Sequence, residues 1–220
     1  MCAKPCSVTF PAVGGGPSLE GILHCPDGSA PFPAAVVCHP HPLMGGRMDN
    51  AVVVTVCRTL AEQGWVALRF NFRGAGGSAG AFDGGRGEMN DVAGAVDFLC
   101  AQTETAQQVG IVGYSFGAEV GLHYAAEKDD PRISWLAGVA LIQKFYTDPF
   151  LDADRRPKLF IAGDQDEWAS ADALREYVAR LKPPKRLCII PGADHIFAGC
   201  ELEVAELIAD FLLALQKGDD

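Results

Sequence analysis

Two periods of hydrophobic and polar residues alternate along the chain. Residues 8–10 and 19–25 alternate one by one around a glycine-rich turn, which predicts an antiparallel hairpin. Short apolar runs predict buried strands at residues 34–38, 66–72, 109–112, 135–142, 159–162 and 187–190. Helical spacing of apolar residues occupies segments 50–63, 89–101, 116–127, 171–181 and 201–216. This alternation predicts an α/β fold, a mostly parallel sheet with helices on both faces.

Length and charge restrict the partners that we expect. A chain of 220 residues, 49% of them hydrophobic and without internal repeats, is expected to form a single domain over residues 1–220. Its 28 acidic and 18 basic side chains give a net charge of -10. That charge repels phosphate backbones and anionic lipid, so we expect a small-molecule partner, with no nucleic acid and no membrane. The sequence predicts no particular oligomeric state.

The apolar runs and the cysteines point to a cytoplasmic protein. No run approaches the roughly 18 apolar residues that span a bilayer, and residues 1–6 lack an apolar signal core. The eight cysteines include no Cys-x-x-Cys pair. We interpret those within apolar runs as reduced core thiols: Cys38, Cys57, Cys100 and Cys188. The five histidines lack zinc-ligand spacing, so we expect no metal and no cofactor.

Two segments match Gly-x-Ser-x-Gly, one at Ser78 and one at Ser115. A nucleophile elbow needs a buried strand directly before the serine and a helix directly after it, with glycines beside the tight turn to prevent clashes. Ser115 has both. Ser78 is separated from its strand and is followed by more glycines, and a dinucleotide-binding interpretation of this segment fails the same helix test. We therefore predict Ser115 as the nucleophile.

A serine hydroxyl becomes a nucleophile when a histidine accepts its proton and a carboxylate orients that histidine. His195 follows the last apolar run and precedes the last helical segment. The preceding apolar run, residues 159–162, leads into a loop with three carboxylates, Asp164, Asp166 and Glu167. The chain order Ser, acid, His is that of α/β-hydrolases, and spacing alone leaves all three acids open.

Several motifs in order resemble the α/β-hydrolase superfamily, specifically its small cap-less serine esterase-like members. The similarity covers roughly residues 30–215, and its motifs are His-Pro-His-Pro at 39–42 with Gly45-Gly46, Arg-Phe-Asn-Phe-Arg-Gly at 69–74 through Ser78, and Gly87-Glu88 with Asp91. The resemblance implies that the acid is Asp166, which stands at a Gly-x-x-Asp spacing. It also implies an α/β-hydrolase fold with minimal or no cap.

Negative charge that develops on the carbonyl oxygen needs backbone N–H donors. Phe116 supplies one, at the start of a helix. In the similar family the second donor lies in the loop after the strand at 34–38, where many members carry His-Gly-x. Here prolines without N–H groups flank His41, which makes His41 the predicted donor and Leu43 the second choice. The rings of His39 and His41 are expected to stiffen this loop.

Residues 143–157 stand where many relatives carry a helical cap, and they are too few for a lid, so we expect an open site. Nearby aromatic residues either line an acyl pocket or fill the core: Phe145, Tyr146, Phe150, Trp168 and Phe197.

The resemblance implies a serine carboxylesterase that acts on short or accessible acyl esters through an acyl-enzyme on Ser115. Thioester, dienelactone-type or peptide hydrolysis and acyl transfer are variants with the same triad. Serine in place of cysteine counts against a dienelactone hydrolase, and an epoxide or haloalkane hydrolase needs Asp at position 115. A non-catalytic ligand-binding member of the fold is the alternative from another class.

Overall fold

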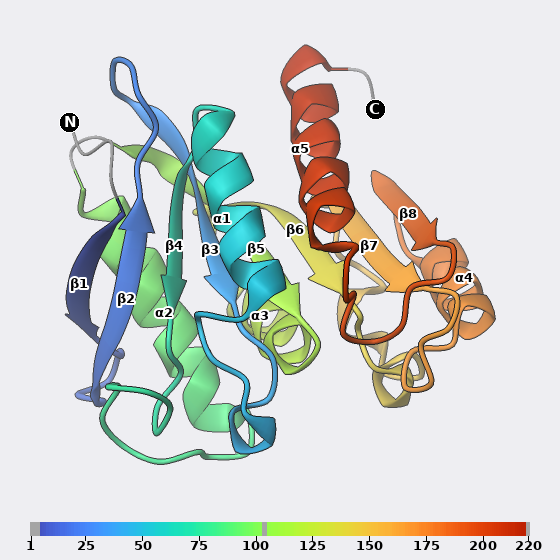
Figure 1. Ribbon diagram of the computed structural model, residues 1–220, viewed down its shortest axis with the longest axis horizontal. Coiled ribbons are helices and arrows are strands. Elements are labelled where there is room, and N and C mark those ends of the chain that lie inside the picture. Colours follow the sequence, from blue (N-terminus) through green and yellow to red (C-terminus); the bar gives the residue numbers. More distant parts are fainter. Residues whose placement is uncertain (1–4, 103–104, 219–220) are drawn as a thin grey trace.

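An eight-stranded sheet forms the centre of the computed structural model, which describes residues 5–102 and 105–218. Its strands follow the order β1-β2-β4-β3-β5-β6-β7-β8 (Figure 1). Their bounds are β1 Cys6–Pro11, β2 Ser18–His24, β3 Phe32–Cys38, β4 Val66–Phe70, β5 Thr105–Tyr114, β6 Ile133–Val139, β7 Lys158–Gly163 and β8 Lys185–Ile190. β2 pairs antiparallel with β1 and β4, and the other neighbours are parallel. The predicted hairpin and mostly parallel sheet are confirmed. Residues 1–4, which belong to the segment without an apolar signal core, lie outside the described residues.

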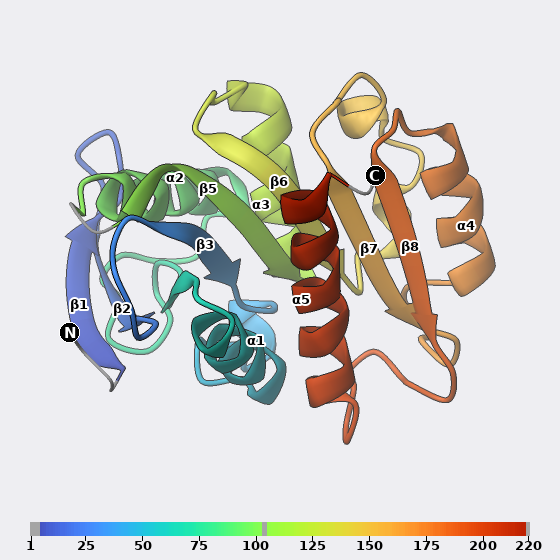
Figure 2. The same cartoon turned by 90° about the horizontal axis from the view of Figure 1, so that it is seen from above.

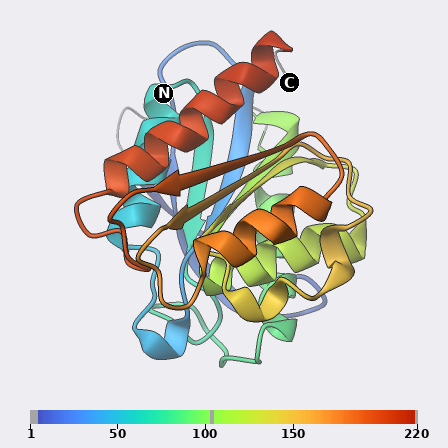
Figure 3. The same ribbon diagram turned by 90° about the vertical axis from the view of Figure 1, so that its right-hand side faces the viewer.

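Helices cover both faces of this sheet. Their bounds are α1 Ala51–Glu62, α2 Arg86–Cys100, α3 Phe116–Lys128, α4 Ala171–Arg180 and α5 Glu201–Lys217. α1 and α5 pack on one face, and α2, α3 and α4 pack on the other (Figures 2 and 3). β3 explains why two faces are needed, because its residues from Ala34 to Cys38 are all buried and their side chains alternate between the two cores. The predicted helices on both faces are confirmed.

The segment between β6 and β7 forms no lid. It contains only two short 3-10 helices, η2 (Gln143–Phe145) and η3 (Pro149–Leu151). In the described part of the chain, no helix combines the length and the apolar character needed to cross a bilayer. Cys38 and Cys57 are buried as predicted, whereas Cys100 and Cys188 are only half-buried. The parallel strands of Figure 1 run downward, and because no lid domain covers their C-terminal ends, we call this side of the sheet the open edge.

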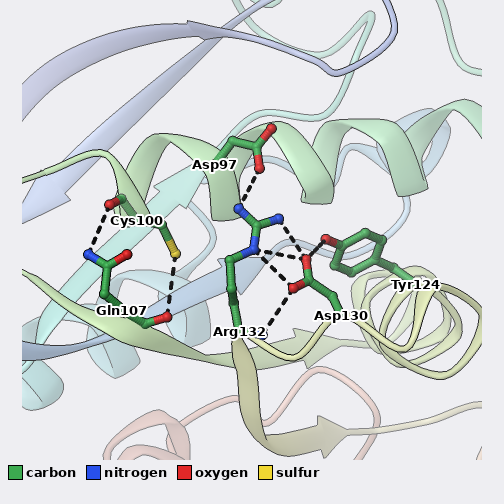
Figure 4. Close-up of polar contacts among 6 residues, drawn as sticks. All are labelled: Asp97, Cys100, Gln107, Tyr124, Asp130 and Arg132. Carbon is green, nitrogen blue, oxygen red and sulfur yellow. Dashed lines mark hydrogen bonds and ion pairs between the residues drawn. The ribbon is translucent and has the colours of Figure 1, made fainter.

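At the other ends of the strands, an ion-pair cluster joins α2 and α3 to the turn that leads into β6 (Figure 4). The Arg132 guanidinium donates to Asp130 through Nε and Nη2, and to Asp97 of α2 through Nη1 at 2.7 Å. The Tyr124 hydroxyl of α3 donates to Asp130 Oδ2 at 2.8 Å. These bonds hold the pKa of Asp130 down at about 2, chiefly because Arg132 stabilises the carboxylate. The cluster fixes the helices against the strands far from the open edge.

Candidate active site

Ser115 stands at the sharp turn between β5 and α3. Its φ of 55° and ψ of -115° lie outside the regions that ordinary residues occupy. The two glycines of the motif make this turn possible: a Cβ at Gly113 would lie 2.3 Å from the Gly117 carbonyl oxygen, and one at Gly117 would lie 2.3 Å from the Cys38 carbonyl oxygen. The strand, turn and helix that the sequence predicted around Ser115 are present.

Ser115, His195 and Asp166 form one hydrogen-bonded chain. The Ser115 hydroxyl lies 2.9 Å from His195 Nε2, and His195 Nδ1 lies 2.8 Å from Asp166 Oδ2. Because the carboxylate only accepts, Nδ1 carries the hydrogen and Nε2 is left to accept the serine proton. Ser115 and Asp166 are 6% and 7% exposed, so water competes little for these bonds. The arrangement can draw a proton from the serine and stabilise the imidazolium that results.

The geometry separates the three acids that the spacing left open. Asp166 accepts the Trp168 and Ala169 N–H groups on Oδ1, at 2.8 and 3.0 Å, which turns Oδ2 toward His195. Asp164 instead accepts the Gly192 N–H at 2.7 Å and so supports the loop that carries His195. Glu167 is exposed in the cleft. Only Asp166 therefore contacts the imidazole.

His41 lines the same cleft as Ser115, and Phe116 follows Ser115 in the chain. The N–H groups of His41 and Phe116 make no hydrogen bond to any residue that the structure describes. The Leu43 N–H, the second choice, is already used, because it donates to His41 Nδ1 at 3.2 Å. The His41 ring packs on the Phe116 ring with centroids 4.8 Å apart, which keeps the two segments together. This placement suits an oxyanion hole formed by His41 and Phe116, a role that stays a prediction.

His39 is a structural residue of the same loop. Its Nε2 accepts the Phe72 N–H at 3.0 Å, and its Nδ1 donates to the Pro40 carbonyl at 2.6 Å. Burial lowers the pKa of His39 to about 4, so the ring is neutral near pH 7 and both nitrogens are in use. Burial also lowers the pKa of His41, which favours its neutral form. Both rings stiffen the loop.

The second Gly-x-Ser-x-Gly segment holds a loop together. The Ser78 hydroxyl donates to the Asn71 carbonyl at 2.6 Å and accepts the Glu20 N–H at 3.0 Å. Nearby, Arg73 donates from Nη2 to Asp91 at 2.7 Å, and the Asp91 side chain has no exposed area. These bonds give Ser78 a structural role in the loop, in line with its rejection as the nucleophile.

An open cleft of about 470 Å³ lies over Ser115 and His195. Trp168 is the one predicted pocket aromatic that lines it: the indole is 48% exposed and its centroid lies 4.7 Å from that of His195. Phe197 does not line the cleft. Its φ of 52° turns the side chain into the core, where it has no exposed area and contacts Tyr114 edge-on. The prediction for Phe197 is therefore wrong.

The other three predicted pocket residues also lie elsewhere. Phe150 stacks on His123 of α3 with centroids 3.9 Å apart, and Phe145 meets the same imidazole edge-on. Tyr146 is 5% exposed and donates its hydroxyl to the Leu141 carbonyl at 2.7 Å. Without a cap, the segment that carries them covers α3 and the sheet instead of the cleft. The acyl-pocket prediction is therefore wrong for Phe145, Tyr146 and Phe150.

Sequence reasoning missed residues that the structure places at the site. The Tyr114 hydroxyl donates to the His195 carbonyl at 2.8 Å and so ties the histidine loop to the elbow. Its position directly before the nucleophile was a usable signal. Met44 and Ile196 also line the cleft, and both are large apolar side chains that are exposed. Within residues 5–102 and 105–218, no three His, Cys, Asp or Glu side chains cluster in a way that could hold a metal ion.

The fold and the site define a class, the α/β serine hydrolases without a lid. The chain matches the X-Pro dipeptidyl-peptidase (S15) family over residues 16–193, most of its length, and belongs to that family. XC6422 of Xanthomonas campestris, an α/β serine hydrolase without lid, is 29% identical with a TM-score of 0.84, over 98% of this chain and 96% of that one. The resemblance to cap-less α/β-hydrolases is thereby confirmed.

Two further relatives are similar over most of their length. The structure of ATU1826 from Agrobacterium tumefaciens is 31% identical with a TM-score of 0.86, over 97% of each chain. The uncharacterized protein RP471 of Rickettsia prowazekii (strain Madrid E) is 37% identical over 194 residues, which cover 84% of this chain and 80% of that protein.

Proposed function

We propose that this serine hydrolase cleaves carboxylic esters through an acyl-enzyme on Ser115. The observation that carries the proposal is the hydrogen-bonded chain from Ser115 through His195 to Asp166, at 2.9 and 2.8 Å, in an open cleft. A cleft without a lid offers few contacts along an extended chain. Since an amide needs more binding energy from remote groups than an activated ester does, this favours esters.

In the proposed mechanism, His195 Nε2 accepts the Ser115 proton as Oγ attacks the carbonyl carbon. The oxygen takes negative charge and is stabilised by the N–H groups of His41 and Phe116. His195 then donates the proton to the departing alcohol, which leaves the acyl group on Ser115. Water, deprotonated by the same imidazole, attacks the acyl-enzyme, and the proton returns to Ser115 Oγ as the acid departs. Asp166 stabilises the imidazolium in both halves.

Peptide hydrolysis is the second candidate, because the matching family is that of X-Pro dipeptidyl-peptidases. The same proton transfers serve an amide, with an amine as the leaving group. The two candidates separate in a direct comparison of a p-nitrophenyl ester series with X-Pro p-nitroanilides. The ester proposal expects kcat/KM for the best ester to exceed that for the best anilide, and the reverse order would replace it with the peptidase.

A fluorophosphonate probe tests the nucleophile that both candidates share. The probe should label the wild-type protein and the Ser78→Ala variant but not the Ser115→Ala variant. Peptide mapping should place the label on Ser115. A folded wild-type protein that stays unlabelled would instead favour a non-catalytic ligand-binding member of the fold.

A further inference from the structure

Exposed apolar side chains gather at the mouth of the cleft. The described residues include six large apolar side chains that are exposed, and three of these line the cleft: Met44 at 66%, Trp168 at 48% and Ile196 at 62%. Met44 belongs to the 3-10 helix η1 (Pro42–Met44) on the oxyanion-loop side, and the other two belong to the loops of Asp166 and His195. An exposed apolar cluster with a polar surround marks a binding surface.

The chemistry assigns two of these side chains to the departing alcohol of an ester. His195 must donate a proton to the oxygen of the departing alcohol, so that oxygen leaves on the imidazole side. Trp168 and Ile196 stand on this side, since the Trp168 ring lies 4.7 Å from the imidazole and Ile196 follows His195 in the chain. Met44 lines the cleft from the other loop, the one that carries His41.

Hydrogen bonds hold the backbone on the leaving-group side. The Trp168 N–H donates to Asp166 Oδ1 at 2.8 Å, and its carbonyl accepts the Gln143 N–H at 2.9 Å. The Ile196 N–H donates to Asp194 Oδ1 at 3.0 Å. The backbone on both sides of the imidazole is thus held by hydrogen bonds, and the exposed indole and isoleucine together present an apolar wall that a substrate group can cover.

The charged side chains beside Trp168 and Ile196 are negative. Among the described residues that line the cleft, the charged side chains are Glu167 and Asp194, and no Lys or Arg lines it. Both carboxylates neighbour the wall in sequence, at Trp168 and Ile196. A negative group on the departing alcohol would meet two like charges there, with no Lys or Arg among the described lining residues to offset them.

We propose that Trp168 and Ile196 form a leaving-group subsite for an apolar, preferably aromatic, alcohol without negative charge. The proposal rests on the ester hydrolysis proposed above and narrows its substrate class. Thioesters of phosphate-bearing carriers and esters of carboxylated or phosphorylated alcohols are poor substrates, because Glu167 and Asp194 repel them.

Two pairs of butyrate esters with the same acyl group test the subsite. The first pair is naphthyl butyrate and ethyl butyrate. The second is a nitrophenyl butyrate that carries a ring carboxylate, matched with the methyl ester of that carboxylate. In the wild-type protein, the neutral member of the second pair should have a kcat/KM about tenfold higher at low ionic strength, and added salt should reduce the ratio.

Variants locate the effect. Ile196→Ala and Trp168→Ala should each lower the naphthyl-to-ethyl ratio of kcat/KM by about threefold to tenfold, since stacking and apolar area are lost. Leu202→Ala is the matched control, because this side chain is 58% exposed on α5 and does not line the cleft. It should leave the ratio unchanged. Glu167→Gln with Asp194→Asn should bring the neutral-to-anionic ratio close to one.

Active-site titration with the fluorophosphonate probe keeps the two levels of inference apart. If Ser115 is labelled and esters are hydrolysed, but the ratios are flat or do not respond to these variants, the subsite proposal is overturned and the ester hydrolase stands. If Ser115 is labelled but only anilides are cleaved, both proposals fail. If the apolar side chains are covered by a second copy of the chain, light scattering will show a dimer and the Ile196→Ala ratio will not change, which also overturns the subsite.

Discussion

At the C-terminal ends of the parallel strands Asp166 faces a histidine, whereas at the N-terminal ends Asp130 faces an arginine. Each carboxylate accepts several short hydrogen bonds, and each links segments that are distant in sequence or in the fold. The partners differ in one property. Histidine gains and loses a proton near neutral pH, and arginine does not.

This difference separates the open edge with Asp166, where a proton can be transferred, from the opposite strand ends with Asp130, where it cannot. Asp166 orients an imidazole whose other nitrogen contacts the Ser115 hydroxyl. The pKa of Asp130 is lowered to about 2 and arginine keeps its proton, so both side chains are charged near neutral pH, and their bonds fix α2 and α3 against the start of β6. A buried or half-buried acid therefore becomes functional through its partner, and its own burial is not sufficient.

The largest effect should come from the serine of each Gly-x-Ser-x-Gly segment. Ser115→Ala should lower kcat by about 10⁴-fold or more, because no other group in the site can form the acyl-enzyme. Ser78→Ala should retain activity per folded molecule and instead cost about 1–3 kcal/mol of unfolding free energy, because the Glu20 N–H and the Asn71 carbonyl lose their partner. Ester kinetics and urea unfolding measure the two. An inactive but stable Ser78→Ala variant would contradict the assignment.

The acids of the open edge give the next largest effect. Asp166→Asn should lower kcat by about 10³-fold to 10⁴-fold, because the amide no longer enforces the Nδ1–H tautomer of His195. Asp164→Asn should lower it only a few-fold, since Asn Oδ1 still accepts the Gly192 N–H. Parallel kinetics on one ester, normalised by fluorophosphonate titration, provide the measurement. An Asp164 variant that is more impaired than the Asp166 variant would reverse the roles.

The same contrast explains what the sequence could predict. Strands, helices and the Ser115 turn follow from local spacing, which is why the order of elements and the open edge were expected correctly. Asp164 and Asp166 could not be separated by spacing, because both lie at one strand end. Only the packing of the loop, in which Oδ1 of Asp166 binds two N–H groups, decides which carboxylate faces His195.

The aromatic residues show where local reasoning fails. The aromatic character of Phe197 and Trp168 predicts that each packs against apolar surface. It does not predict whether the side chain points into the core or into the cleft. The positive φ of Phe197 turns it inward, while the Trp168 backbone is held so that the indole faces the cleft. Similarly, the strand predicted for residues 135–142 ends at Val139, because Ala140 has a φ of 49°. Such backbone reversals at non-glycine residues leave little trace in a single sequence.

The pH dependence should sharpen the contrast between the two edges. The proposed mechanism needs an unprotonated Nε2 on His195, so acid should lower kcat/KM, with a limiting slope of about tenfold per pH unit. Fluorescence or circular dichroism over the same range should show that the protein stays folded, so that the loss of activity is assigned to the site. Activity that is constant from pH 5 to pH 8 would contradict His195 as the base.

The smallest effect is expected at the N-terminal strand ends, where Asp130 pairs with Arg132. The pKa of Asp130 is lowered to about 2, so the stability it contributes is present above the unfolded-chain value of about 3.9 and is lost as the pH falls toward 2. Because the Arg132 side chain is 36% exposed and its ion pairs are screened, we expect Asp130→Asn to cost about 1 kcal/mol at pH 7. Urea unfolding of both proteins at pH 7 and near pH 3 should show this gap narrowing, with ester turnover at pH 7 unchanged. A gap that widens with acid would contradict the lowered pKa of Asp130, and a loss of turnover would mean that this ion pair is coupled to the proton transfers at the open edge.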